Sequence, residues 1–184
     1  TNHWMRGGAY GWQAADNGCV GICWTNTMPN TPAWGGIEPK IGNNPFIISI
    51  PQSVGRHIVI DCAMSQFAFG KIEMERMKGE KLPVAGGFDS DGNPTTDPAE
   101  IEKTGRALTI GYWKGSGLSI ALDLVAAVLS GGNTVTDIGR KYTEEVGLSQ
   151  VMIAIDPNHM QGAALTDEII ERVVSDIKTA TPTR

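Results

Sequence analysis

The sequence has 184 residues, of which 41% are hydrophobic and 19% charged, and its formal net charge is −5. This apolar content is too high for a disordered chain, and an acidic balance without a basic stripe argues against a nucleic-acid partner. The most apolar run is interrupted by Asp123 and falls short of the roughly 18 residues that a membrane span needs, so we expect no membrane partner.

The first third of the sequence predicts one helix followed by three strands. Residues 7–18 favour a short helix that ends at a glycine, and the apolar run 19–24 is typical of a buried strand. A loop rich in Asn, Pro, Thr and Gly covers 25–45. Two β-branched runs, 46–50 and 57–60, predict two more strands joined by a turn.

Two helices are expected next. Ser65 is a candidate cap for a helix that ends near Gly79. After a turn-rich stretch, Asp97 is expected to cap a second helix, with proline in its first position and Glu100 reaching back to complete a capping box.

The last third contains the strongest helical signal. Residues 118–129 predict a helix that stops at a pair of glycines, and 151–155 predict a strand. Thr166 is expected to cap a final helix with one apolar face. Because strands and helices interleave, the fold class is α/β or α+β.

The glycine-rich segment 111–117 is the most informative local feature. A glycine-rich loop that opens a helix exposes backbone N–H groups, and Lys114 and Ser116 add further donors. The segment matches neither a Walker loop nor the dinucleotide fingerprint. Its residues are compatible with an anion site or with a tight turn that caps a helix.

The histidines and cysteines show no metal-ligand spacing, and we expect no metal site. His3 could polarise a carbonyl or move a proton, or could be an exposed residue near a terminus. His57 and His159 are expected to be structural. The three cysteines are expected to be free thiols in a reducing compartment.

Two acidic features remain open to more than one interpretation. Asp61 ends an apolar strand, so it could bind a ligand or cap the following helix. Asp89 and Glu100 echo part of a calcium loop, but Pro94 stands where that loop needs glycine, so a polar turn is favoured.

Seven segments together resemble a known family. They are NHWMRGGAYGW (2–12), GICWTNTMPN (21–30), IGNNPFIISIP (41–51), IVIDCAMSQFAFGKIE (58–73), TTDPAEI (95–101), GYWKGSGLSIALDLVAAVLSGG (111–132) and LSQVMIAIDP (148–157). In order and spacing they resemble the malate/L-lactate dehydrogenase family, also called sulfolactate dehydrogenase-like, which lacks a Rossmann fold.

The resemblance implies a cytoplasmic, homodimeric reductase of small 2-keto acids. It implies a non-Rossmann NAD(P)-binding domain with a largely antiparallel or mixed sheet flanked by helices, and NADH as cofactor, with NADPH the alternative. His3 matches a histidine close to the substrate, and the 25–26 and 42–45 segments match parts that line the site; many relatives carry Thr where Asn43 stands. By the same resemblance, the cofactor-binding residues are Ile58, Val59, Ile60, Asp61, Cys62, Ala63, Met64, Trp113, Lys114 and Gly115.

The resemblance also predicts that residues 1–184 are one cofactor-binding domain from a longer enzyme. Family members carry an N-terminal segment with a Ser-His pair and an arginine, and a Pro-Gly-Glu contact near the C-terminus, which this sequence lacks. The histidine of that pair is the family's principal proton donor, so this chain alone is expected to be inactive. Other family substrates (malate, lactate, ureidoglycolate, sulfolactate, cyclic imines) and a non-catalytic binding module remain alternatives.

Overall fold

A computed structural model describes residues 2–160 and 163–181 of the chain. The chain forms two compact units, each assembled from separate stretches of sequence. The first unit contains the start of the chain up to Met5, Trp24–Phe46 and Cys62–Val151. The second contains Arg6–Cys23, Ile47–Asp61 and the chain from Met152 onward.

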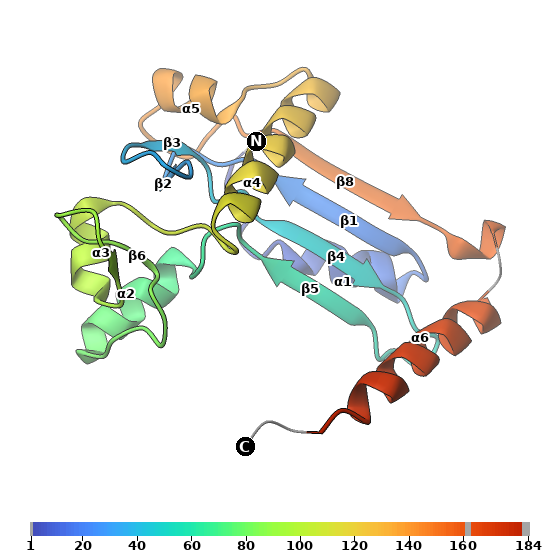
Figure 1. The fold of residues 1–184 in the computed structure, drawn as a ribbon. Coiled ribbons are helices and arrows are strands. Elements are labelled where there is room, and N and C mark those ends of the chain that lie inside the picture. The colour runs from blue at the N-terminus through green and yellow to red at the C-terminus, as the bar shows by residue number, and fades with distance from the viewer. Residues whose placement is uncertain (1, 161–162, 182–184) are drawn as a thin grey trace. The chain divides into compact units, whose positions relative to one another are not determined.

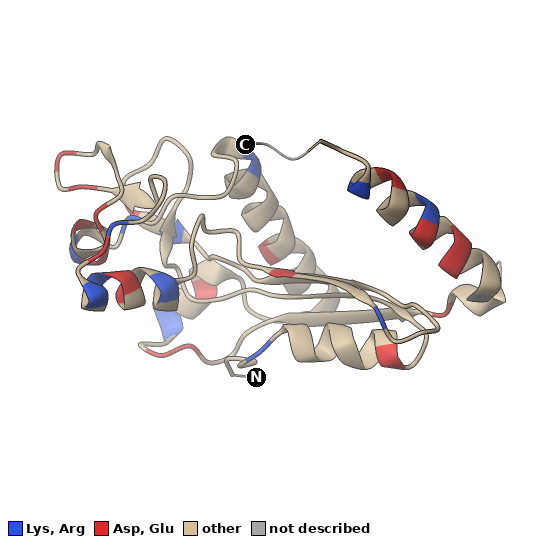
Figure 2. Ribbon diagram, turned by 90° about the horizontal axis from the view of Figure 1, so that it is seen from below, with Lys and Arg blue, Asp and Glu red and all other residues tan. Residues whose placement is uncertain are grey.

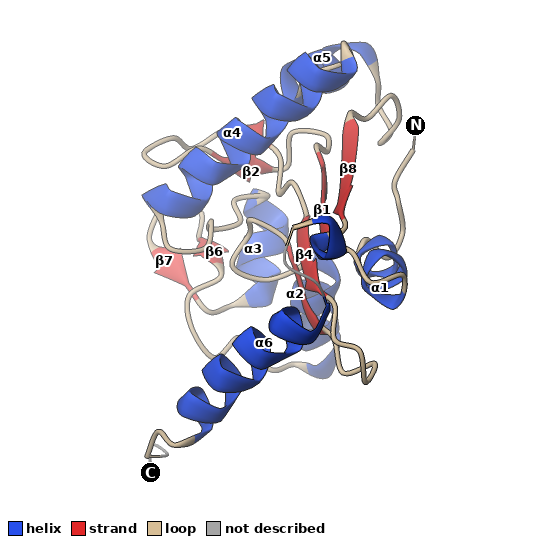
Figure 3. Ribbon diagram, turned by 90° about the vertical axis from the view of Figure 1, so that its right-hand side faces the viewer, coloured by secondary structure: helices blue, strands red, loops and turns tan. Residues whose placement is uncertain are grey.

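Helices and strands are interspersed along the chain (Figures 1 and 3). In order they are α1 (Gly8–Asp16), β1 (Val20–Thr25), β2 (Thr31–Pro32), β3 (Pro39–Ile41), β4 (Phe46–Ile50), β5 (Ile58–Cys62), α2 (Phe69–Lys78), β6 (Gly87–Phe88), β7 (Pro94–Thr95), α3 (Pro98–Thr104), α4 (Trp113–Ser130), α5 (Val135–Lys141), β8 (Gln150–Ile155), a 3-10 turn (Pro157–His159) and α6 (Ala163–Lys178).

Most of the four-stranded sheet belongs to the second unit, in the order β5-β4-β1-β8. Neighbouring strands run in opposite directions, and α1 and α6 lie on opposite sides of the sheet (Figures 1 and 3). Helix α1 packs closely against β1 and β4, and two glycines make this approach possible. A Cβ at Gly11 would lie 2.6 Å from the Ile47 side chain, and a Cβ at Gly21 would lie 2.9 Å from the Ala14 side chain. The expected mixed fold with a largely antiparallel sheet is confirmed.

Helix α6 begins earlier than the sequence predicts. Thr166 lies inside the helix rather than at its cap, and the neighbouring Asp167 accepts hydrogen bonds from the backbone N–H and hydroxyl of Ser53 in the β4–β5 turn. Of the expected apolar face, Ile170 is buried, whereas Val173 and Ile177 are exposed.

The first unit contains a lobe in which α2 and α3 pack against each other around Ile72, Leu82 and Ile101. The expected Ser65 cap is wrong: α2 begins after Ala68, and Ser65 instead forms a β-bridge with a residue 44 positions later, Thr109. Such long-range pairing cannot be inferred from local capping patterns.

Helix α3 begins as predicted, but without the full capping box. Asp97 accepts a hydrogen bond from the Ala99 N–H, and a proline occupies the first turn. Glu100 does not reach back, because its carboxylate contacts the Ser90 hydroxyl and the Lys103 ammonium. The polar turn expected around Asp89 is present, with the Asp89 carboxylate accepting the N–H group of Asn93.

Helix α4 starts five residues before the predicted position. The expectation that no segment is long and apolar enough to span a membrane is wrong for this helix. Its 18 residues have a mean hydropathy of 1.2, which meets the length and composition of a membrane span. One such helix is weak evidence, because core helices meet the same criterion, and 33% of it is buried inside the protein. Charges on α4 are few (Figure 2), and its Asp123 accepts hydrogen bonds from other parts of the first unit.

Helix α5 has no counterpart among the predicted elements. Thr134 and Asp137 form a reciprocal capping box at its start, in which each side chain accepts the other residue's backbone N–H. The Thr-x-x-Asp spacing is visible in the sequence, but the helix has only seven residues and a weak apolar pattern.

Candidate active site

A buried polar network in the first unit holds the chain immediately after β1. The Asn26 side chain is fully buried, and its Nδ2 donates to the Asp123 carboxylate and to the Asn133 carbonyl, both at 2.8 Å. Its Oδ1 accepts the Ser149 N–H at 2.8 Å. Burial raises the pKa of Asp123, and the donors from Asn26 and Val135 oppose that rise. The network therefore joins β1, α4 and β8 at one point.

A second buried amide, Asn44, fixes the loop over residues 42–45. Its Oδ1 accepts the Thr27 N–H at 3.1 Å, and its Nδ2 donates to the Ser119 carbonyl at 2.8 Å. The Ser119 hydroxyl donates to the Gly42 carbonyl at 2.6 Å. A Cβ at Gly42 would overlap the Asn44 amide, so the loop requires glycine at that position. The loop is thus held by α4 on one side and by the end of β1 on the other.

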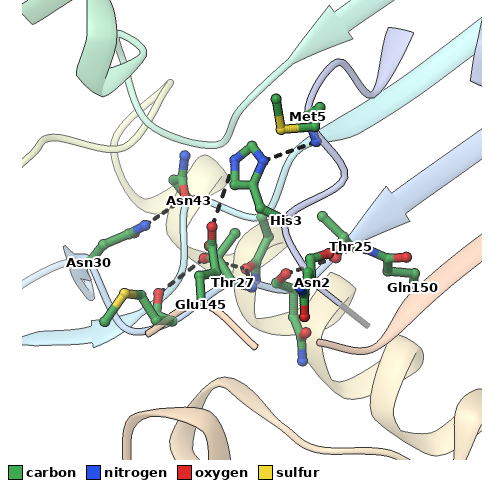
Figure 4. Close-up of polar contacts among 12 residues, drawn as sticks. Asn2, His3, Met5, Thr25, Thr27, Asn30, Asn43, Glu145 and Gln150 are labelled. Carbon is green, nitrogen blue, oxygen red and sulfur yellow. Dashed lines mark hydrogen bonds and ion pairs between the residues drawn. The ribbon is translucent and has the colours of Figure 1, made fainter. Parts of the chain in front are cut away.

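Asn43 is the residue that this loop presents. Its Oδ1 accepts from Asn30 Nδ2 at 2.7 Å, and its carbonyl accepts the Met64 N–H at 2.7 Å (Figure 4). The amide orientation is therefore set, and Asn43 Nδ2 has no hydrogen-bond partner among the described residues. A half-buried amide held in this way is a ready donor to an oxygen atom of a ligand.

His3 lies in the same unit, with one ring nitrogen already used. Its Nδ1 accepts the Met5 N–H at 2.9 Å, so the neutral ring carries its proton on Nε2. Nε2 lies 3.7 Å from the Glu145 carboxylate, and 55% of the His3 side chain is exposed (Figure 4). Met5 holds a left-handed φ of 64°, which is uncommon for a residue other than glycine. The Nε2–H group is therefore available to an acceptor such as a carbonyl oxygen.

The candidate segment Ile58–Met64 crosses from the second unit into the first after Asp61. Asp61 accepts the N–H of Gly8 at 2.9 Å, and a Cβ at Gly8 would lie 2.6 Å from its carboxylate. The carboxylate therefore sits at the start of α1, a helix that precedes it in the sequence, and not at the following helix as one interpretation expected. Met64 is buried, and its carbonyl accepts the Ile110 N–H at 2.9 Å.

The candidate segment at Trp113–Gly115 forms the first turn of α4 rather than an open loop. The backbone N–H groups of Lys114, Gly115 and Ser116 donate hydrogen bonds to the backbone carbonyls of residues 110–112. They are therefore not available to bind an anion. Gly115 is required for packing, because a Cβ there would overlap the Ile110 carbonyl. The groups of this segment that remain available to a ligand are the Lys114 ammonium and the Trp113 ring.

Both of these groups are accessible. Lys114 Nζ forms no ion pair with the described residues and lies 5.7 Å from the centre of the Trp113 ring, which is 59% exposed. Through Ile110, this turn is hydrogen-bonded to the Met64 end of the other candidate segment. An exposed cation and an exposed aromatic ring beside a narrow backbone turn fit a dinucleotide, whose phosphates need a charge and whose base needs a flat surface.

The remaining titratable candidates have structural partners. His57 is nearly buried, with Nδ1 accepting the Gln52 N–H at 2.9 Å and Nε2 lying 3.2 Å from the Asp16 carboxylate. His159 lies 3.5 Å from Asp156. None of Cys19, Cys23 and Cys62 forms a disulfide, and burial raises the pKa of Cys23. Within residues 2–160 and 163–181, no three His, Cys, Asp or Glu side chains converge as a metal site would require.

Comparisons with known proteins identify the family of the chain. The malate/L-lactate dehydrogenase family matches residues 1–184. The 2,3-diketo-L-gulonate reductases of Klebsiella pneumoniae (strain 342) and Citrobacter koseri are each 48% identical over 180 residues, which is 98% of this chain and 54% of theirs. The chain therefore spans about half the length of these curated relatives.

Solved structures show the same fold. Sulfolactate dehydrogenase from Methanocaldococcus jannaschii aligns with a TM-score of 0.83 and 29% identity, over 100% of this chain and 53% of that one. The delta1-piperideine-2-carboxylate reductase from Pseudomonas syringae aligns with a TM-score of 0.80 and 30% identity, over 99% and 55%. The chain belongs to the malate/L-lactate dehydrogenase family.

Proposed function

We propose that the natural protein containing this chain is an NAD(P)H-dependent reductase of a 2-keto acid, and that the keto acid is 2,3-diketo-L-gulonate. The observation that carries the proposal is 48% identity to such reductases across 98% of the chain. The proposal includes a cytoplasmic homodimer that uses NADH, with NADPH as the alternative. Residues 1–184 would form the cofactor-binding domain.

The proposed roles on the substrate side follow from two fixed donors. A bound nicotinamide cofactor would supply the hydride for the keto carbon. His3 would donate its Nε2–H to the keto oxygen and polarise the carbonyl, because Nδ1 is occupied by the Met5 N–H. Asn43 would donate its Nδ2–H to a second oxygen of the substrate. The principal proton donor would come from outside residues 1–184.

The proposed roles on the cofactor side are shared between two segments. Lys114 would neutralise a phosphate, and the Trp113 ring would supply a flat apolar surface. The Ile58–Met64 segment would supply backbone contacts. Gly115 would act by packing, since the absence of a side chain lets the turn close on Ile110.

A second candidate function uses the same scaffold on another substrate. The likeness to a sulfolactate dehydrogenase and to a cyclic-imine reductase, at 29% and 30% identity, keeps both substrate classes open. A non-catalytic binding module is the candidate from another class, and it would show no dependence on a nicotinamide cofactor.

One experiment separates these candidates. The natural protein would be assayed for NADH and NADPH oxidation with 2,3-diketo-L-gulonate, oxaloacetate, pyruvate, sulfopyruvate and delta1-piperideine-2-carboxylate. We expect the highest kcat/KM with the diketo acid and a loss of about a hundredfold to a thousandfold in His3→Asn, within the range for general acid–base groups. His159→Asn, an exposed histidine, is the matched control. Absence of cofactor oxidation with every substrate would contradict the proposal.

A further inference from the structure

Glu145 is the acidic side chain beside His3, and the backbone pairing of two distant segments places it there. Asn2 and Val146 form an antiparallel β-bridge. In an antiparallel pair, the residue after one bridge partner lies opposite the residue before the other, so His3 lies opposite Glu145. The Glu145 carboxylate is 3.7 Å from His3 Nε2, and the two side chains point toward each other (Figure 4). Both residues belong to the first unit.

The segment that carries Glu145 is tied to the rest of this unit by hydrogen bonds. Gly147 has a left-handed φ of 70°, and its carbonyl accepts a hydrogen bond from Asn133 Nδ2 at 2.8 Å. Beyond the bridge, Gln150 Nε2 donates to the Asn2 carbonyl at 3.0 Å. The backbone that presents the carboxylate is therefore held on its C-terminal side.

The Glu145 carboxylate lacks a hydrogen-bond donor among residues 2–160 and 163–181, and His3 is its one ion-pair partner there. The separation of 3.7 Å is too long for a hydrogen bond. His3 Nδ1 accepts the Met5 N–H, so the neutral ring brings no positive charge to the carboxylate. Only 22% of the Glu145 side chain is exposed. A shielded carboxylate without a donor favours a ligand that brings one.

Glu145 and the substrate would share one side of the histidine. The Nε2–H group of His3 is the donor proposed for the keto oxygen, and Glu145 lies at that same nitrogen. A keto acid bound there would therefore lie beside a carboxylate. A carboxylate accepts hydrogen bonds from hydroxyl groups and repels other anions. 2,3-Diketo-L-gulonate carries several hydroxyl groups and one carboxylate, whereas oxaloacetate and sulfopyruvate each carry a second anionic group.

We propose that Glu145 is a specificity-determining residue, which accepts a hydroxyl group of the substrate and excludes keto acids that carry a second anionic group. The substrate class is then a polyhydroxylated keto acid with a single carboxylate. The inference rests on the proposed function, because it names the substrate class of that same site. It assigns the choice of substrate to a residue outside the segments that the sequence singled out.

The kinetic test uses the natural protein with NADH and three keto acids: 2,3-diketo-L-gulonate, oxaloacetate, and pyruvate, which has neither hydroxyl groups nor a second charge. Glu145→Gln should raise kcat/KM for oxaloacetate by on the order of tenfold to a hundredfold, because a like charge is removed. Glu145→Ala should also lower kcat/KM for the diketo acid by on the order of tenfold, because the acceptor is lost. Pyruvate should respond little to either change. Glu144→Gln, which alters the exposed neighbouring carboxylate, is the matched control.

A binding titration makes the same comparison without turnover. In the presence of NADH neither L-gulonate nor L-malate can be oxidised, so calorimetry reports their affinities directly. We expect the wild type to bind gulonate, a polyhydroxylated monoanion, more tightly than malate, a dianion. Glu145→Gln should narrow the ratio of the two affinities by on the order of tenfold, and Glu144→Gln should leave it unchanged.

Each outcome decides the inference. Parallel losses on all three keto acids would give Glu145 a merely structural role and overturn the inference, as would an unchanged ratio in Glu145→Gln or binding of neither hydroxy acid. Reduction of any keto acid with NADH would then show that the proposed function still holds. An affinity ratio that depends on Glu145, in a protein that reduces no keto acid, would support the role of Glu145 and contradict the proposed function.

Discussion

Replacing Asn44 by alanine tests whether the buried amide holds the site together. The substitution leaves the Thr27 N–H, a buried donor, without an acceptor, which costs about 1–3 kcal/mol. It also removes the hydrogen bond to the Ser119 carbonyl, worth roughly 0.5–1.5 kcal/mol. We therefore expect a loss of about 2–4 kcal/mol in the free energy of unfolding, a drop in Tm on the order of 5–15 °C for a domain of this size.

The assay is urea unfolding followed by far-UV circular dichroism, with thermal melts as a second readout. The matched control is Asn93→Ala, an exposed asparagine in a turn of the same unit, for which we expect a change within about 0.5 kcal/mol. If Asn44→Ala unfolds at the same urea midpoint as Asn93→Ala, the hydrogen bonds of the buried amide do not stabilise the loop 42–45, and the prediction is wrong.

Three further predictions concern the same unit. Gly115→Ala should destabilise the protein by about 1–3 kcal/mol because its Cβ overlaps Ile110, whereas Gly117→Ala, with open space and a helical backbone, should stabilise it by up to about 1 kcal/mol; equal urea midpoints would contradict the packing argument. Burial raises the pKa of Asp123 above its unfolded value of about 3.9, so its contribution to stability is fully present below that value and is lost as pH rises through the folded pKa. Asp123→Asn keeps the acceptor oxygen, and urea midpoints measured from acid to neutral pH should fall less with rising pH than in the wild type; parallel curves would refute this. Lys114→Ala should raise the Michaelis constant for the cofactor by roughly tenfold with little change in turnover at saturation, as expected when one charged contact is lost, while Lys40→Ala, paired only with Glu38, should leave both unchanged.

Several structural features that depend only on neighbouring residues, such as helix caps and strands, agree with the predictions made from the sequence. The Asp97 cap, the left-handed glycines that end α2 and α4, and the β-branched strands depend on one or two turns of chain, so the sequence predicted them. The start of α4 did not follow, because the glycine-rich segment closes on Ile110 and becomes helical. For the same reason, the N–H groups of Lys114, Gly115 and Ser116 are bonded within that turn, as the tight-turn interpretation requires and the anion-site interpretation does not.

Several site features depended on contacts that local patterns cannot reveal. The family resemblance pointed to Asn26 and to the 42–45 loop, but not to the fact that Asn44 and Asn26 are buried and saturated with hydrogen bonds. Glu145 carried no local signal, because a pair of glutamates in a polar stretch is common on protein surfaces.

The sequence by itself determined most of the longer helices and strands, the mixed fold class and the family, because periodicity, capping residues and seven ordered segments are local or linear properties. Only the tertiary structure showed that the Asp61 carboxylate meets the N–H of Gly8, 53 residues away, at the start of a helix that neither interpretation of the sequence had named. It alone brought Met64, Ile110 and Gly115 together and placed the Glu145 carboxylate beside His3. Buried backbone N–H and carbonyl groups must form hydrogen bonds, and here their partners lie far away in the sequence. Which groups pair therefore depends on the packing of the whole chain and not on local sequence.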